Sequence, residues 1–168
     1  LKVVYDNGGI YLDTDVELLK KSDFLLENQC YIGIQQPESL CTTGLGFGAQ
    51  KSSPVVQKMM ECYDSISFTD QKKSTFACPW LNDKVIRSFG KVSNEDITYL
   101  KEVTVYPPCF FDPLSTGNTK NLLCDETVSI HHYAATWAGN KQRWKRKLIR
   151  FFGEDRYFKL KKLFRRVQ

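Results

Sequence analysis

The chain has 168 residues, with 24 Lys and Arg, 19 Asp and Glu and a formal net charge of +5. This length can bury a core without disulfides, and no stretch approaches the ~20 apolar residues that span a bilayer. The positive charge is local, because residues 141–168 hold twelve Lys or Arg and two acids. It accompanies no recognisable nucleic-acid motif, so we expect no nucleic-acid partner.

The first predicted elements are a short helix and a strand. Three side chains at the start of the chain recur at helical spacing: Leu1, Val4 and Tyr5. Asn7-Gly8-Gly9 then supplies residues that tolerate positive φ, which ends a helix and lets the chain turn. A strand is therefore expected to open at residues 10–13.

Two carboxylates at the end of this strand form the first candidate site. Alternation in a strand would place Tyr11, Asp13 and Asp15 on one face. The two acidic Cα atoms would lie roughly 6.6 Å apart, so both acids reach one Mg²⁺ only if the strand bends, since ligand oxygens lie about 2.1 Å from that ion. Otherwise one acid binds the metal and the other a water or a ribose hydroxyl. A calcium-binding EF-hand is excluded, because its glycine would fall on Leu18 and its closing glutamate on Phe24.

The next segment, residues 43–49, is rich in glycine. It lacks the Lys-Ser/Thr of a P-loop and the Gly-x-Gly-x-x-Gly spacing. Its simplest interpretation is a flexible turn before a helix that Ser53 caps and Pro54 begins. The apolar residues of that helix recur at helical spacing: Val55, Val56, Met59, Met60 and Tyr63.

The middle of the chain predicts a second helix, a strand region and a loop. Val85, Ile86 and Phe89 follow Cys78-Pro79 at helical spacing, and Gly90 closes the pattern. Residues 97–106 indicate strand structure. Residues 112–127 carry Asp, Pro, Ser, Gly and Asn, which are typical of a loop.

The second candidate site contains the two histidines of the chain. Val128 and Ile130 alternate as in a short buried strand, which ends where His131 and His132 begin. One imidazole added to two carboxylates suits Mn²⁺. Adjacent residues on a strand face opposite ways, so only one histidine should coordinate, and the residues alone do not choose between them.

Six cysteines raise the question of disulfides. Their spacing is irregular and holds no Cys-x-x-Cys pair, which argues against a zinc ribbon. We expect reduced, mostly buried thiols at Cys30, Cys41, Cys62, Cys78, Cys109 and Cys124.

The segment Gly-Gly-Ile-Tyr-Leu-Asp-Thr-Asp-Val-Glu-Leu-Leu at residues 8–19 resembles the DXD signature of glycosyltransferase family 32. That family includes bacterial capsular polysaccharide and lipopolysaccharide transferases and yeast mannosyltransferases. The resemblance implies an α/β fold of the GT-A type, with a Rossmann-like sheet, in which the DXD acids hold Mn²⁺ or Mg²⁺ against the diphosphate of a nucleotide sugar. It implies that Asp15 is the more direct metal ligand, that Asp13 serves ribose and metal together, and that Tyr11 lies near the nucleoside.

The histidine segment, ending Thr136-Trp137, resembles the His-His-aromatic and Ser-Trp or Thr-Trp ending of the same family. There a histidine completes the metal site, so His131 and His132 are the candidates, with a slight preference for His131. Trp137 would lie beside the diphosphate. The family's small-residue stretch lines the sugar and acceptor pocket, which makes Gly46 and Gly48 places where backbone approaches a sugar closely.

A further segment, Cys78-Pro79-Trp80-Leu81-Asn82-Asp83, resembles the family's Gly-Pro-x-x-x-Thr only loosely. Cys78 replaces the glycine, and Asn82 or Asp83 stands where threonine is usual. By this resemblance the last two are candidates for acceptor binding. Residues 106–111 resemble the proline-bearing strand before the family's variable loop.

The expected organisation is the C-terminal part of a GT-A catalytic domain at residues 1–139 and a basic amphipathic helical tail at 140–168. In the resembled family, strands and an Asp-x-x-Arg helix precede a segment like residues 1–7. A chain lacking them would expose a sheet edge and self-associate. Two interpretations of the tail stay open. It could lie on an anionic membrane surface, or it could pack on its own domain.

The expected function is metal-dependent transfer of a hexose from a UDP- or GDP-sugar to a hydroxyl of a surface glycan or lipid-linked oligosaccharide, with retention of configuration. The expected place is the inner face of a bacterial membrane, or the Golgi lumen in a eukaryote. Two alternatives are a noncatalytic membrane-associated module and a metal-dependent nucleotidyl- or phosphotransferase. Base, sugar, linkage and acceptor stay open.

Overall fold

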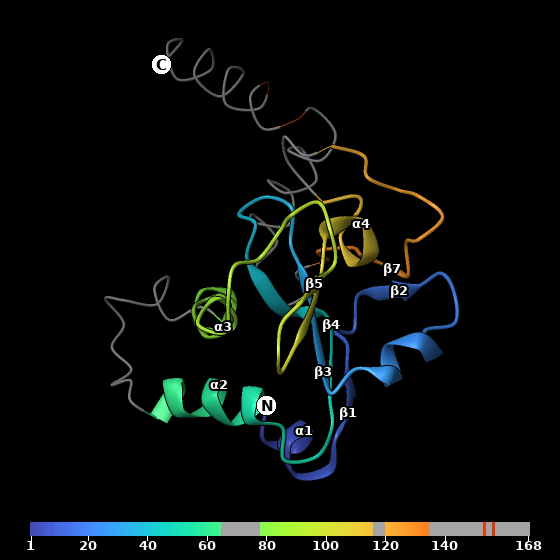
Figure 1. Cartoon of the computed structure of the whole chain (residues 1–168). Helices are drawn as coiled ribbons and strands as arrows, with labels where there is room; N and C mark the ends of the chain where they lie inside the picture. Colours follow the sequence, from blue (N-terminus) through green and yellow to red (C-terminus); the bar gives the residue numbers. More distant parts are fainter. Residues whose placement is uncertain (65–77, 116–119, 135–152, 154–155, 157–168) are drawn as a thin grey trace, which may run out of the picture.

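The computed structural model describes residues 1–64, 78–115, 120–134, 153 and 156. Within these residues a five-stranded sheet has the strand order β1-β4-β3-β6-β5, and a two-stranded ribbon joins β2 to β7 (Figure 1). The strands are β1 (Gly9–Tyr11), β2 (Val16–Leu18), β3 (Cys30–Ile34), β4 (Cys41–Ala49), β5 (Thr98–Tyr99), β6 (Thr104–Tyr106) and β7 (Ser129–His131). The helices are α1 (Lys2–Asn7), the 3-10 helix η1 (Asp23–Glu27), α2 (Pro54–Asp64), α3 (Cys78–Arg87) and α4 (Pro108–Phe111).

The sheet is mixed. Strands β3 and β6 are parallel, and the pairs β1–β4, β3–β4 and β5–β6 are antiparallel. The register of β3 against β4 is interrupted, because Ile32 pairs with Phe47 whereas Gly33 pairs with Thr42. Residues 43–46 are therefore extra residues on β4, which form a bulge in this central strand.

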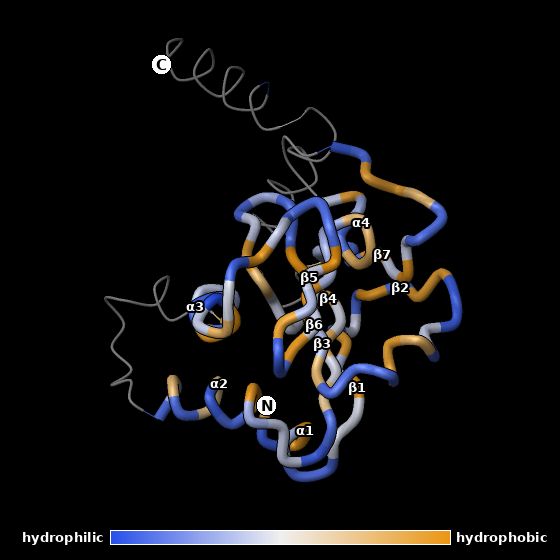
Figure 2. Tube along the Cα trace, in the orientation of Figure 1, coloured by the Kyte–Doolittle hydropathy of each residue, from blue (hydrophilic) through white to orange (hydrophobic). Residues whose placement is uncertain are grey.

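Two apolar layers cover the two faces of the sheet. On one face α2 and α3 bury Val55, Val56, Met59, Val85 and Ile86 against the central strands. The other face is covered by α4, by η1 and by the segment just before β7. The buried residues there are Leu25, Phe110, Phe111 and Val128, together with Tyr31 and Tyr106 of the sheet. Apolar residues run through the central strands and hydrophilic residues through the connecting loops (Figure 2). The sheet is thus packed on both faces, and the β1–β2 turn follows its edge strand β1.

Much of the expected secondary structure is confirmed. A helix ends at Asn7, α2 begins at Pro54, and residues 97–106 contain the paired strands β5 and β6. The α/β class is also confirmed, by the mixed sheet with its parallel pair. No helix within the described ranges has the length and apolar character needed to cross a membrane.

Three local predictions are wrong. The strand expected over residues 10–13 ends at Tyr11. Residues 43–49 lie within β4, a nine-residue strand, and are not a flexible turn. The proline-bearing segment after Tyr106 forms α4 instead of a strand, because Pro107 and Pro108 set φ for a first helical turn.

The cysteines meet the prediction in part. All six are free thiols, as expected, but only Cys30 and Cys41 are buried.

Candidate metal centre

A turn at the end of β1 brings the two acids together. The N–H of Val16 donates to the carbonyl of Asp13 at 3.1 Å, which closes a turn over residues 13–16. The strand prediction placed the two acids along an extended chain, where their reach to one ion required a bend. The turn provides that bend and lets both carboxylates face one point.

Strand pairing brings a histidine to the same place from the far end of the chain. Strand β2 starts directly after Asp15 and pairs antiparallel with β7, so that Val16 lies opposite His131. The N–H of His132 donates to the carbonyl of Asp15 at 2.9 Å and extends the pairing to the turn. The imidazole of His131 therefore stands beside the acidic pair.

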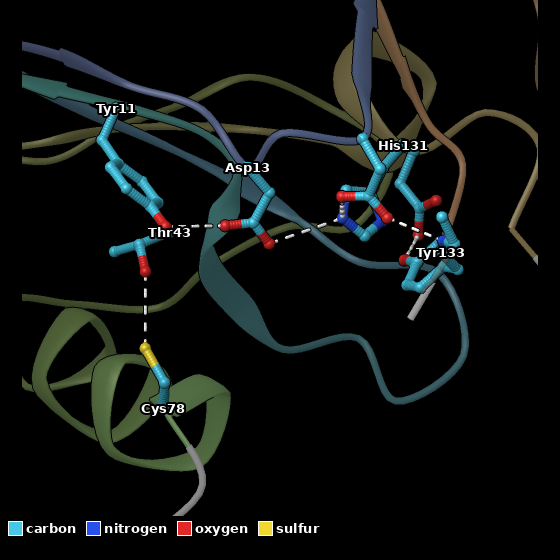
Figure 3. A network of polar contacts seen from close by, with 9 residues as sticks. Tyr11, Asp13, Thr43, Cys78, His131 and Tyr133 are labelled. Atoms are coloured by element: carbon cyan, nitrogen blue, oxygen red, sulfur yellow. Dashed lines mark hydrogen bonds and ion pairs between the residues drawn. The ribbon is translucent and has the colours of Figure 1, made fainter. Parts of the chain in front are cut away.

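The three side chains form a compact cluster. Nε2 of His131 lies 3.5 Å from Oδ2 of Asp13 and 3.2 Å from Oδ1 of Asp15. One ligand atom from each residue lies within 4.8 Å of the other two, and no other group of three potential ligands does so in the part of the chain that the structure describes. Figure 3 shows Tyr11 and His131 approaching Asp13 from opposite sides.

In each carboxylate one oxygen accepts a hydrogen bond from the protein, and the other oxygen faces the imidazole of His131. The hydroxyl of Tyr11 donates to Oδ1 of Asp13 at 2.8 Å, and the N–H of Ala134 donates to Oδ2 of Asp15 at 2.7 Å. The bond to Asp13 is also the main reason why the pKa of Tyr11 is raised, so this phenol stays protonated as a donor at neutral pH. The remaining oxygens, Oδ2 of Asp13 and Oδ1 of Asp15, face His131.

The imidazole of His131 is suited to a metal. Its side chain is nine-tenths buried. Nε2 lies beside the two carboxylates without making a hydrogen bond to either, and Nδ1 has no hydrogen-bond partner among the described residues. A buried polar group without a partner is costly unless an unseen ligand satisfies it. Ligand atoms about 2.1 Å from an octahedral Mg²⁺ lie about 3.0 Å from their neighbours, close to the 3.2 and 3.5 Å found here. The residues present therefore fit a divalent cation.

One participant, Gly44, was missed by the sequence reasoning. Its carbonyl accepts the N–H of Asp13 at 3.1 Å, and a Cβ on Gly44 would lie 2.5 Å from Oδ2 of Asp13. The bulge on β4 thus places bare backbone against the carboxylate. The signal in the sequence that could identify this contact is the glycine at every second position from 44 to 48.

His132 lies outside the cluster. Its Nε2 is 2.8 Å from Oε2 of Glu17, at the exposed side of the β2–β7 ribbon. The expectation that a single histidine joins the acids is met by His131. The residue after β7 faces the opposite way from His131, so the ring of His132 lies beside Glu17 and a metal-ligand role for it remains a prediction without support from the cluster.

Gly46 and Gly48 are packed against aromatic rings. A Cβ on Gly48 would lie 2.4 Å from the ring of Tyr31, and one on Gly46 would lie 3.4 Å from the ring of Phe111. These glycines make room for side chains of the core. Gly48 also lines a pocket of about 300 Å³ with Ile10 and Tyr31, and the approach of a sugar to these glycines remains a prediction.

The two polar residues of α3 have structural partners. Asn82 is fully buried and donates to Cys78 Sγ at 3.0 Å and to Thr43 Oγ1 at 3.3 Å. Asp83 accepts the N–H of Cys41 at 3.0 Å and pairs with Arg87 at 2.8 Å. Both hold α3 against β4. Both side chains are buried, and the acceptor-binding role suggested for them remains a prediction.

Trp137 and the basic tail at 140–168 fall almost wholly outside the described residues, so their predicted roles remain predictions. No family model, curated protein or solved structure matches the chain. The functional conclusion therefore depends on the geometry of the site and on the resemblance in the motif residues.

Proposed function

We propose that this chain is part of a metal-dependent glycosyltransferase of the GT-A type, which moves a hexose from a nucleotide sugar to a hydroxyl of a glycan or lipid-linked acceptor. One observation supports the proposal above others. The acids of the Asp-x-Asp motif and a histidine from the distant His-His motif lie within 4.8 Å of one another. The mixed α/β sheet is compatible with the proposed fold.

Asp13, Asp15 and His131 would hold Mn²⁺ or Mg²⁺, with Asp15 as the more direct acidic ligand. Two carboxylates and one imidazole leave coordination positions for phosphate oxygens. When bound, the cation supplies neutralisation of the charge that develops on the departing nucleoside diphosphate. Trp137 is proposed to lie beside that diphosphate, and the tail at 141–168 to contact an anionic membrane surface.

The first experiment measures Mn²⁺ binding by calorimetry and by the EPR signal of free Mn²⁺. Asp15→Asn and His131→Ala each remove one ligand, and we expect the Kd to rise by about 10- to 100-fold or more. Asp23→Asn is the matched control, because Asp23 is an exposed acid in the first turn of η1, away from the cluster. Unchanged Mn²⁺ affinity in both site variants would exclude the proposed centre.

The second experiment identifies the chemistry. A thermal-shift screen of UDP- and GDP-sugars, with and without Mn²⁺, should find a donor that stabilises the protein only with the metal. Turnover of that donor should release nucleoside diphosphate. Release of pyrophosphate from a triphosphate would indicate the alternative nucleotidyltransferase instead. Binding to anionic liposomes without any effect of metal or nucleotide would indicate the noncatalytic membrane module.

A further inference from the structure

Behind the proposed metal centre lies a buried acid that the motifs did not identify. Asp112 follows α4 and is 0% exposed, which is rare for a carboxylate. Its Oδ2 accepts two hydrogen bonds at 2.8 Å, from the N–H of Gln36 and from the hydroxyl of Tyr133. Burial nevertheless raises the pKa of Asp112. A group that is costly to bury and retained in the core needs a structural reason.

Tyr133 connects this acid to the site. Its ring contacts His131 edge to face, with the ring centroids 4.1 Å apart and the planes at 87°. The backbone of Tyr133 has φ 50, a left-handed conformation that is uncommon for a bulky residue. The hydrogen bond to Asp112 helps to hold that conformation, and with it the ring that packs against His131.

Gln36 fixes the other side of Asp112. Its side-chain amide donates to the carbonyls of Asp112, Pro113 and Lys120 at 2.9, 3.0 and 3.0 Å, and its Oε1 accepts the N–H of Lys120 at 3.1 Å. One glutamine from the β3–β4 connection therefore joins Asp112, Pro113 and Lys120. Gln36 thus holds the backbone of Asp112 through its side chain, and one oxygen of the carboxylate through its own N–H.

We propose that Asp112 is a positioning residue for His131 and acts through Tyr133. Histidine ligands of metals are commonly oriented by a carboxylate or carbonyl that accepts the second ring N–H. Here neither nitrogen of His131 makes such a bond among the described residues. The ring of Tyr133, which the hydrogen bond to Asp112 anchors, orients the imidazole instead. The proposal rests on the proposed metal centre and names a residue that the Asp-x-Asp and His-His motifs do not contain.

The test uses Tyr133→Phe and Asp112→Asn in the whole chain. Tyr133→Phe keeps the ring against His131 and removes only the hydroxyl that Asp112 accepts. We expect the Kd for Mn²⁺ to rise by about 10-fold in Tyr133→Phe and by about 10- to 100-fold in Asp112→Asn. Asp83→Asn is the matched control, since it changes another buried acid that accepts a backbone N–H, away from the cluster. Its Mn²⁺ affinity should equal that of the wild type.

A second readout needs no metal. The imidazole signals of His131 in ¹⁵N-histidine spectra, assigned with His132→Gln, should shift and broaden in Tyr133→Phe as the ring loses its fixed orientation. Unchanged His131 signals, or unchanged Mn²⁺ affinity in a folded Tyr133→Phe and Asp112→Asn, would overturn the positioning role. Failure of the wild type to bind Mn²⁺ would remove the proposed function, whereas the spectra would still decide whether Asp112 orients His131.

Discussion

At the scale of single residues, the site depends on how each carboxylate oxygen is occupied. Asp13 and Asp15 each give one oxygen to a donor from the protein and leave the other facing His131. A carboxylate held in this way loses less rotamer freedom when it binds an ion, because part of that freedom is already lost. The cluster is therefore arranged for a ligand before the ligand arrives.

Gly44→Ala tests this arrangement. The added methyl would lie 2.5 Å from Oδ2 of Asp13, a contact that forces the carboxylate or the bulge to move. We expect the Kd for Mn²⁺ to rise by about 10-fold or more, measured by calorimetry. Gly46→Ala is the comparison variant on the same bulge. Gly46 has a φ of +155, and its added Cβ would lie 3.4 Å from the ring of Phe111, so this variant should have a lower thermal stability. Equal Mn²⁺ affinity in Gly44→Ala and wild type would contradict the role of bare backbone there.

At the scale of elements, the centre is held by pairings that bring distant parts of the chain together. The β2–β7 ribbon carries His131 to Asp15, and the bulge of β4 carries Gly44 to Asp13. Helix α3 fixes the start of β4 through Asp83, which accepts the N–H of Cys41 and pairs with Arg87. The position of the site thus depends on these two pairings, whereas the contacts of Asp83 stabilise the fold.

Asp83→Ala is predicted to destabilise the fold. It leaves the N–H of Cys41 without its buried acceptor, which costs about 1–3 kcal/mol, so the urea midpoint should fall. Lys84→Ala, on an exposed position of the same helix, should change stability by no more than about 0.5 kcal/mol. A loss of acceptor binding by Asp83→Asn without loss of stability would support the role that the sequence suggested for this residue.

The sequence predicted the participants of the site better than their geometry. The spacing of the motif predicted Asp13 and Asp15, and alternation predicted that only one of two adjacent histidines would face them, although the strand itself ends at Tyr11. The pattern missed the turn over residues 13–16, because that turn is stabilised by the ribbon that begins after it. Gly44 could not be assigned from local pattern, since its reason for being glycine is a carboxylate on another strand. Asp112 follows α4, a helix that the sequence pattern did not predict. Its partners Gln36 and Tyr133 come from separate parts of the chain, so no local pattern identifies the three together.

At the scale of the whole molecule, the six free thiols differ in burial. Burial raises the pKa of Cys30 and Cys41 to about 12, so both stay neutral thiols at pH 7.5. Cys78 and Cys124 are exposed. Because the thiolate is the form that reacts, an alkylating reagent should label the exposed pair first and the buried pair only in denaturant, as peptide mass spectrometry would show. Prompt labelling of Cys41 in the folded protein would contradict the buried core.

The same thiols predict a loss of stability at alkaline pH. A thiol whose pKa is raised in the folded state favours folding below its unfolded pKa of about 9 and loses that contribution as the pH rises toward about 12. The thermal midpoint should therefore fall between pH 9 and 11. Cys41→Ala should reduce the dependence on pH even though it creates a small cavity. An unchanged alkaline dependence in this variant would assign the effect to other groups.

Self-association is predicted from an edge strand of the sheet. Among the strands that the structure describes, β1 is at one end of the order, and Ile10 and Tyr11 on it are 42% and 47% exposed. An edge strand with exposed apolar side chains is a template for pairing with a second chain. Light scattering after size-exclusion chromatography should show a mass that rises with concentration. Ile10→Lys should shift the protein toward monomer because a charge on the edge opposes pairing, whereas Leu123→Lys, at an exposed loop position, should not. A monodisperse wild-type monomer at high concentration would show that this edge is protected.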